Sequence, residues 1–184
     1  MTTTVLAIVI SATLAILIPV IIYVNKRYFV GGFLTIKIDF KTGTSSPAGV
    51  LIPYIDEDGF GIRNRSIVRH HLTWTYKLTI TNNSDHTAYF PRLYYKNDQF
   101  PDITIEKLEE LKPIGSKESV TMNIKFFENS DTLPTQRKQT DKPPTDFTTL
   151  RLLLEYYNGY DSKFYTLYDN ADKSNKPSKL RPNF

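Results

Sequence analysis

The feature that most constrains this chain is residues 2–24, which contain no charged side chain and end against Asn25-Lys26-Arg27. A helix needs about 20 mostly apolar residues to cross a lipid core about 30 Å thick, and this run is that long. A cleaved signal peptide is the alternative, but such peptides begin with positive residues and end at small ones. Threonines follow Met1, and Ile21-Ile22-Tyr23 stands where small residues belong. Residues 1–27 are therefore predicted to form a transmembrane anchor.

The residues that follow this run suggest an orientation. Cations flank membrane spans on the cytoplasmic side, and aromatic rings settle at the headgroup boundary. We therefore expect a single-pass protein of the cell (inner) membrane, with the C-terminal domain in the cytoplasm and the lipid bilayer as a partner. The expected membrane-interface residues are Tyr23, Lys26, Arg27, Tyr28 and Phe29.

Composition bounds the rest of the chain. Residues 28–32 contain Gly31-Gly32 and are expected to form a joint, and the length beyond them suits one domain. The chain has no cysteine, which excludes disulfides, thiolate metal ligands and a cysteine nucleophile. Its net charge of +4 is spread over interspersed acids and bases, whereas nucleic-acid binding needs clustered cations. No nucleic-acid partner is expected.

The clearest strand pattern lies in residues 72–81, where apolar and polar side chains alternate strictly. Period-two alternation of that length puts one face on a core and the other in solvent, so Trp74 is expected in the core rather than as a ligand platform. Similar patterns occupy residues 33–40, 88–96, 120–126, 150–156 and 164–168, and Pro91 suggests a sheet edge or a bulge. Turns are expected at residues 42–47, 56–59, 82–85 and 158–159, and residues 103–111 fit either a strand or a helical turn. This series predicts an all-β antiparallel sandwich or small barrel over residues 33–168.

Two segments lack the apolar side chains that a core needs. Residues 129–146 contain Pro134, Pro143 and Pro144 and are expected to form a mobile loop. Residues 169–184 are expected to form a flexible basic tail.

Three segments together resemble the immunoglobulin-like sandwich domains of bacterial membrane-anchored and surface proteins. They are residues 79–95, residues 111–115 leading to Ser119-Val120, and the closing hairpin of residues 152–168. The resemblance implies an antiparallel immunoglobulin-like β-sandwich, and such domains commonly serve as binding or spacer modules. The Cys…Trp…Cys spacing of antibody-type domains is absent.

The histidines do not form a metal-binding pattern. His70 and His71 are adjacent, and neighbouring residues of a strand point to opposite faces. His86 stands apart from both, and zinc sites need three or four ligands in recognisable spacings. No metal ligand is therefore assigned.

The acidic residues do not form a calcium-binding or catalytic pattern either. Asp56-Glu57-Asp58-Gly59 brings glycine too early for a calcium loop, whose twelfth place falls on Ile67, so a hairpin turn is expected. Glu109-Glu110 has no evident catalytic partner, and neither a G-x-S-x-G elbow nor a glycine-rich phosphate loop is present. We assign no catalytic residue and no cofactor, and do not expect an enzyme.

These observations favour a non-catalytic protein-interaction or scaffold module held at the membrane. The surfaces first expected to bind a protein partner are the sheet edge near Pro91 and residues 129–146. The alternative is a membrane-tethered sensor or effector whose β-domain binds a small molecule in an aromatic-lined pocket. Asn64-Arg65-Ser66 and Asn82-Asn83-Ser84 also match the glycosylation sequon, which matters only in an extracytoplasmic domain.

Overall fold

A computed structural model describes residues 2–28, 33–62, 65–95, 103–105, 112–133, 140–144 and 146–184. The structure is mostly β. One α-helix precedes them, and a 3-10 helix, η4, lies between β5 and β6. The elements in chain order are α1 (Thr2–Tyr28), β1 (Leu34–Ile52), β2 (Ile67–Asn82), β3 (Tyr89–Tyr95), β4 (Ile103–Ile105), β5 (Ser119–Thr132), η4 (Phe147–Thr149), β6 (Arg151–Tyr157), β7 (Lys163–Asp169) and β8 (Ser174–Ser178).

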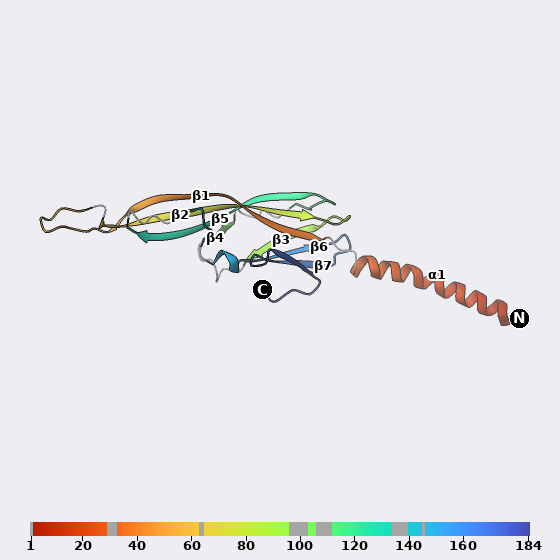
Figure 1. The fold of residues 1–184 in the computed structure, drawn as a ribbon. Coiled ribbons are helices and arrows are strands. Elements are labelled where there is room, and N and C mark those ends of the chain that lie inside the picture. Colours follow the sequence, from red (N-terminus) through yellow and green to blue (C-terminus); the bar gives the residue numbers. More distant parts are fainter. Residues whose placement is uncertain are drawn as a thin grey trace.

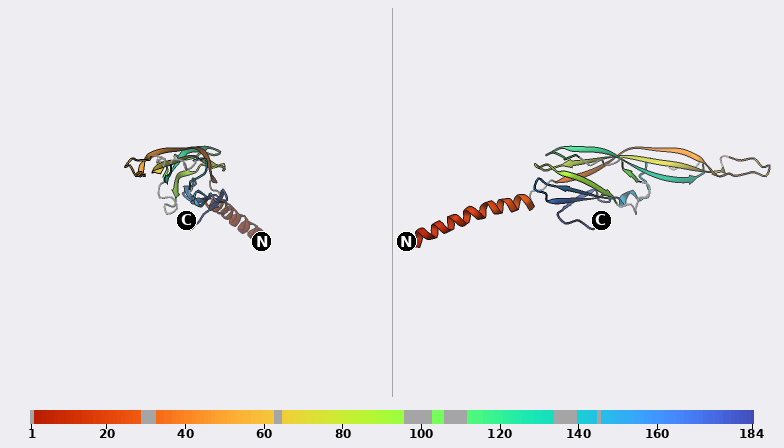
Figure 2. Two further views of the ribbon diagram at one scale, coloured as in Figure 1. Left: turned by 60° about the vertical axis from the view of Figure 1, so that its left-hand side comes forward. Right: turned by 180° about the vertical axis from the view of Figure 1, so that it is seen from behind.

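The strands form two antiparallel sheets that lie face to face (Figure 1, Figure 2). The first sheet has the order β1-β2-β5-β4, and the second has the order β3-β6-β7-β8. The chain therefore crosses from the first sheet to the second at β3, returns for β4 and β5, and crosses again for β6. Two antiparallel layers confirm the β-sandwich part of the sequence prediction.

The core lies between the two sheets and follows the predicted parity of β2. Leu72, Trp74, Tyr76, Leu78 and Ile80 are all buried, and the residues between them are more exposed. Side chains from β6 and β7 meet this face from the second sheet. Each strand thus places alternate apolar residues against the opposite layer, as a two-layer sandwich requires.

The turn expected at residues 42–47 is wrong, because these residues belong to β1. They pair with β2 from Thr42↔Thr75 to Pro47↔His70. Register shifts between Phe40 and Thr42 and between Pro47 and Gly49 accommodate the glycine and proline that suggested a turn. Pairing with a well-patterned neighbouring strand has overridden the local turn preference.

The far end of the β1–β2 hairpin, which we call the arm (residues 50–62 and 65–68), projects beyond the second sheet, away from α1 (Figure 1). Its tip is an ordered turn, as predicted for residues 56–59. The Asp56 Oδ1 accepts a hydrogen bond of 2.7 Å from the Phe60 N–H, and Gly59 has a φ of +83°. The bridge Ile55↔Gly61 and the Ile62 N–H donating to the Tyr54 carbonyl extend the pairing behind the turn.

The predicted transmembrane segment needs correction. In α1, the structure describes the side chains of Ser11 and of residues 13–26. Pro19 lies inside this helix. Crossing a bilayer takes about 20 consecutive apolar residues. Within the described residues, no helix meets the length and apolar character needed to cross a membrane. The membrane-spanning helix of the predicted fold is therefore wrong, whereas the sandwich that follows it stands.

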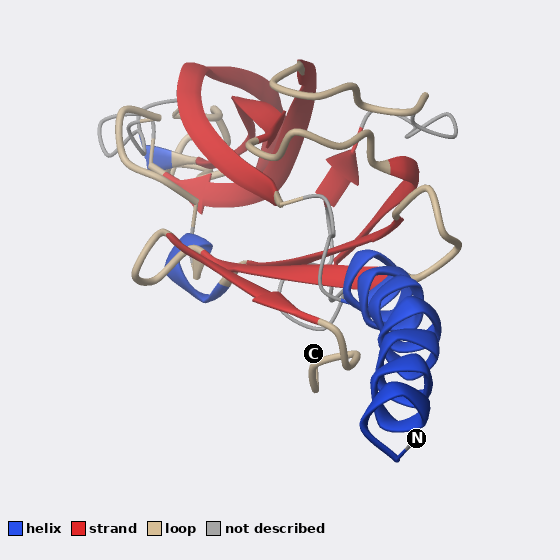
Figure 3. Ribbon diagram, turned by 90° about the vertical axis from the view of Figure 1, so that its right-hand side faces the viewer, coloured by secondary structure: helices blue, strands red, loops and turns tan. Residues whose placement is uncertain are grey.

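Residues 169–184, expected as a flexible tail, contain the strand β8. It pairs with β7 from Tyr165↔Ser178 to Asp169↔Ser174. Beyond it, the Arg181 guanidinium lies 5.6 Å from the centre of the Tyr94 ring on β3, at the opposite edge of the second sheet. The end of the chain therefore passes from one edge of this sheet to the other, with the C-terminus lying beside it (Figure 3).

Side chains from β7 and β8 join the second sheet to the outer edge of β1. The Asn175 Nδ2 donates to the Ile36 carbonyl at 3.0 Å, and its Oδ1 accepts from the Ile36 N–H at 2.7 Å. The Thr166 hydroxyl donates to the Leu34 carbonyl at 2.9 Å. These bonds supply the start of β1 with partners on the side that faces away from β2.

The buried His70 generates a stability prediction. Both of its ring nitrogens are buried without a hydrogen-bond partner among the described residues. An unsatisfied buried polar group costs about 1–3 kcal/mol, so His70→Leu should raise the free energy of unfolding in urea by an amount in that range. The control is His71→Leu, since His71 is exposed and bonds Asn129. Equal stability of wild type and His70→Leu would contradict the assignment.

Tyr76 generates a prediction at alkaline pH. Its ring stacks on Phe147 with centroids 4.4 Å apart, and burial raises the pKa of its phenol to about 12. The unfolded tyrosine titrates near pH 10, so the unfolded state loses its proton first. Stability is then fully present below about pH 10 and falls by about 2–3 kcal/mol as the pH rises to about 12.

Tyr76→Phe should make this alkaline decline shallower in unfolding curves recorded from pH 9 to 12. It should not abolish the decline, because burial also raises the pKa values of Tyr156 and Tyr168. Tyr54→Phe in the exposed arm serves as the control. An unchanged slope in Tyr76→Phe would refute the role given to this phenol.

Candidate functional site

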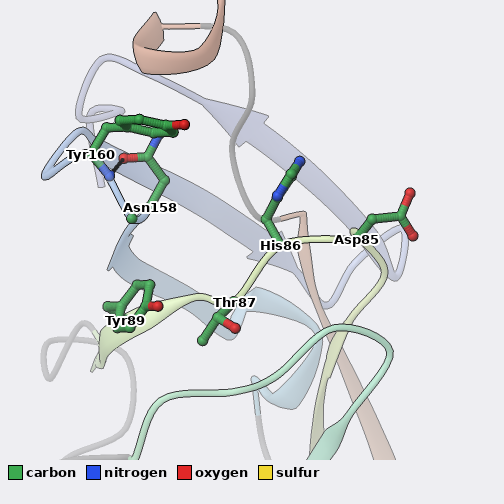
Figure 4. Close-up of a pocket in the computed structure, with 7 residues that line it drawn as sticks. Asp85, His86, Thr87, Tyr89, Asn158 and Tyr160 are labelled. Atoms are coloured by element: carbon green, nitrogen blue, oxygen red, sulfur yellow. Dashed lines mark hydrogen bonds between the residues drawn. The ribbon is translucent and has the colours of Figure 1, made fainter.

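A cavity of about 280 Å³ opens where two loops meet at the end of the sandwich nearer α1 (Figure 4). One loop connects β2 to β3, and the other is the turn between β6 and β7. The lining residues are Asp85, His86, Thr87 and Tyr89 from the first loop and the start of β3, and Asn158, Gly159 and Tyr160 from the second.

The fully buried Asn82 at the end of β2 fixes the first loop. Its Nδ2 donates to the carbonyls of His86, Ile114 and Gly115 at 2.7, 3.0 and 3.0 Å. Its Oδ1 accepts from the Ser84 N–H at 3.0 Å and from the Ser84 hydroxyl at 2.7 Å. This network holds the backbone on both sides of His86, and it leaves Asn82 inaccessible as a glycosylation acceptor in the folded chain.

The opposite wall is fixed in a similar way by Asn158. Its Oδ1 accepts from the N–H groups of Tyr160 and Ser162, each at 2.9 Å, and its own N–H donates to the Ser162 carbonyl at 3.0 Å. The predicted Asn158-Gly159 turn is therefore confirmed. A Cβ placed on Gly159 would lie 3.7 Å from Cε2 of Tyr89, so the Tyr89 ring sits close to the backbone of this turn.

Some polar side chains that line the cavity have partners within the chain, and others have none among the described residues. The Asp85 carboxylate pairs with Lys117 at 3.1 Å, and the Lys117 ammonium also donates to the Asn83 carbonyl at 2.8 Å. Among the described residues, no side-chain hydrogen bond is made by His86, Thr87, Tyr89 or Tyr160. Their imidazole, hydroxyl and phenol groups remain open to a molecule in the cavity.

An exposed aromatic group lies next to the cavity on β3. Phe90 has a φ of +49°, which is unusual for a bulky residue, and its ring lies 6.4 Å from that of Tyr157. The Lys163 Nζ lies 5.1 Å from the centre of the Tyr157 ring. Hydrogen bonding to the side chains of Tyr157 and Glu155 raises the pKa of Lys163. Pro91 is buried beside this group, at a register shift on an edge strand, so both the edge and the bulge predicted from Pro91 are confirmed.

The predicted chemical groups do not gather at one place. His70 lies buried on the inner face of β2, His71 is exposed on the other face, and only His86 reaches the cavity. Glu109-Glu110 lies outside the described residues. In the described part of the chain, no group of three or more such side chains could hold a metal ion.

Four of the five expected membrane-interface residues, Tyr23, Lys26, Arg27 and Tyr28, belong to the last turns of α1. Tyr23 and Lys26 are exposed there, and Phe29 and the side chains of Arg27 and Tyr28 lie outside the described residues. Their assigned role depended on a membrane-spanning helix, which the described residues do not contain.

The segment expected to be a mobile loop, residues 129–146, begins inside β5. Within this segment, the Lys142 carbonyl accepts a hydrogen bond of 2.7 Å from the Trp74 Nε1.

Sequence reasoning missed the cavity. The sequence predicts turns at residues 82–85 and 158–159 and a strand at residues 88–96, and nothing local indicates that these segments meet. The signal available was that two polar turns containing Asn and Asp each join consecutive strands. Their meeting depends on the pairing of Ala88 with Ile114 and of Tyr89 with Tyr157, which joins distant parts of the sequence.

Comparison of the chain with protein-family models, with curated proteins and with solved structures found no match. The resemblance to immunoglobulin-like domains stays a prediction.

The role given to Asn82 can be tested by substitution. Asn82→Ala removes the five hydrogen bonds that this side chain makes. A hydrogen bond contributes about 0.5–1.5 kcal/mol net, so we expect a loss of about 3 kcal/mol in urea unfolding. Asn83→Ala is the matched control, because the Asn83 amide is exposed and, among the side chains that the structure describes, bonds only Thr35. Similar losses for both variants would show that Asn82 has no special role.

Proposed function

We propose that this chain is a non-catalytic protein-interaction module, and that the arm is its docking element. The partner is a protein with an apolar cleft rimmed by basic side chains. The observation that carries the proposal is the set of large apolar side chains that the arm leaves exposed: Val50, Leu51, Ile52, Tyr54, Ile55 and Phe60.

The exposure of these side chains follows from the geometry of the arm. A register shift interrupts the alternation of β1 between Val50 and Ile52, which pair with the adjacent residues Val68 and Ile67. Val50, Leu51 and Ile52 are all exposed. Phe60, at the tip, is 72% exposed. Contiguous exposed apolar surface is uncommon on a folded protein and marks sites of interaction.

The arm is also ordered before any partner binds. Its tip is closed by the Asp56–Phe60 hydrogen bonds, and Arg65 lies over the Tyr54 ring at 5.4 Å. At its base, Arg69 binds Asp131 of β5 through two bonds of 2.8 Å, which lower the pKa of the Asp131 carboxyl. A preorganised element loses less conformational entropy on docking, which favours affinity.

Charge at the tip indicates the kind of partner. Asp56, Glu57 and Asp58 form the turn, next to the exposed Phe60. Carboxylates are repelled by the negative surface of anionic lipids and attracted by basic protein surfaces. An acidic tip flanked by apolar side chains therefore favours a protein cleft with a basic rim over a lipid surface.

The test is co-purification of the full chain from the cells that make it, with mass spectrometry of what is retained. The double variant Ile55→Asp/Phe60→Asp should retain the partner at least about tenfold less, since one or two central side chains usually dominate an interface. The variant should keep the wild-type melting temperature, because both side chains are exposed. Phe90→Asp is the matched control, an exposed aromatic of the second sheet at 63% exposure.

Loss of the partner in the arm variant but not in Phe90→Asp supports the proposal. Equal retention by all three proteins would place the interface elsewhere. A wild-type chain that is monomeric and retains nothing would remove the proposal altogether.

A further inference from the structure

We propose that the cavity between the β2–β3 loop and the β6–β7 turn binds a neutral pyranose sugar. This site lies at the opposite end of β2 from the arm, so it stands apart from the proposed docking function. The inference rests on the unpaired hydrogen-bonding groups of the cavity, on its tyrosine rings, on its charge balance and on its fixed walls.

The open polar groups suit a ligand with several hydroxyls. Among the described residues, His86, Thr87, Tyr89 and Tyr160 make no side-chain hydrogen bond, and all line one cavity. Hydroxyl and imidazole groups both donate and accept, and a sugar hydroxyl does the same. Such a set recognises a polyol better than it recognises a hydrocarbon, which would leave these groups unpaired.

The two tyrosines add apolar surface to this set. The Tyr89 ring lies against Gly159, and Tyr160 stands above it on the other wall, next to Asn158 (Figure 4). A pyranose has one face made largely of C–H groups, and a tyrosine ring offers that face a flat partner while its phenol meets the hydroxyls. Aromatic side chains with a polar end suit sites of this mixed character.

The charge of the site favours a neutral ligand. The Asp85 carboxylate is matched by the Lys117 ammonium at 3.1 Å, so neither sign dominates the cavity. A phosphate or a carboxylate ligand would need an excess of cationic groups, and a cationic ligand would need an unmatched carboxylate. Asp85 can still accept one sugar hydroxyl while it remains paired with Lys117.

The size and rigidity of the cavity limit the ligand to one ring. A volume of about 280 Å³ lies just below the range of about 300–1,000 Å³ typical of drug-sized ligands. The side chains of Asn82 and Asn158 fix the two walls through hydrogen bonds to backbone groups. The cavity is therefore formed before binding and needs little reorganisation.

The experiment is titration of the isotope-labelled full chain with the methyl glycosides of glucose, galactose and mannose and with N-acetylglucosamine, followed by amide chemical shifts. At least one sugar should shift the amides of Gly159, Tyr160 and His86 in a saturable way. Tyr160→Ala should weaken that binding at least about tenfold. Tyr54→Ala is the matched control, because Tyr54 and Tyr160 are 42% and 41% exposed at opposite ends of the molecule.

Saturable shifts that depend on Tyr160 and not on Tyr54 support the site. The absence of shifts with every sugar at tens of millimolar, or equal binding by Tyr160→Ala and wild type, overturns it. Shifts confined to the arm would also overturn it. The arm variant Ile55→Asp/Phe60→Asp should bind sugar normally, so failure of the docking proposal and failure of this one are distinguishable.

Discussion

The structure depends on how the outer edge of β1 is closed. An edge strand presents backbone N–H and carbonyl groups that must find partners. At Ile36, the Asn175 side chain supplies both a donor and an acceptor, and so acts as a short piece of neighbouring strand. Because Asn175 belongs to β8, the same contact joins the first sheet to the edge of the second. The Thr166 hydroxyl repeats this link at Leu34 from β7.

Beyond this closure, β1 extends toward the arm. After the register shift between Phe40 and Thr42, β1 continues to pair with β2 on one side only among the described strands. Residues 140–142 support the first part of this extension, since a Cβ on Gly43 would collide with Thr140 and Trp74 bonds Lys142. Pro47 and the nearby register shifts interrupt the exposed edge, as natural proteins do to prevent strand addition. The edge of β1 is thus protected from strand addition, which leaves the exposed side chains of the arm as the contact surface that we propose.

Strict alternation of apolar and polar residues was enough to predict which face of a strand is buried. The buried face of β2 was correct residue by residue, because the period of two in residues 72–80 admits only one buried face. Residues 42–47 were mistaken for a turn because glycine and proline are strong local signals, and only pairing with β2 shows them to be strand. Strand β8, with the sequence SNKPS, has no apolar alternation at all and exists through its pairing with β7 and through Asn175. The cavity was beyond prediction for the same reason, since non-local pairing brings its two loops together.

The two proposed surfaces are connected by one strand, which bears on how they act. Strand β2 runs from Ile67 at the base of the arm to Asn82 beside the cavity, and its 16 residues span about 50 Å at about 3.3 Å each. Coupling between two sites requires an element with two arrangements that both ligands bias. Between the two sites, β2 pairs with β1 on one side and with β5 on the other over most of its length. Its alternate side chains are buried, so a shift of register would expose them, and β2 has a single stable arrangement. A partner on the arm and a ligand in the cavity should therefore bind independently, with β2 serving as a rigid spacer between them.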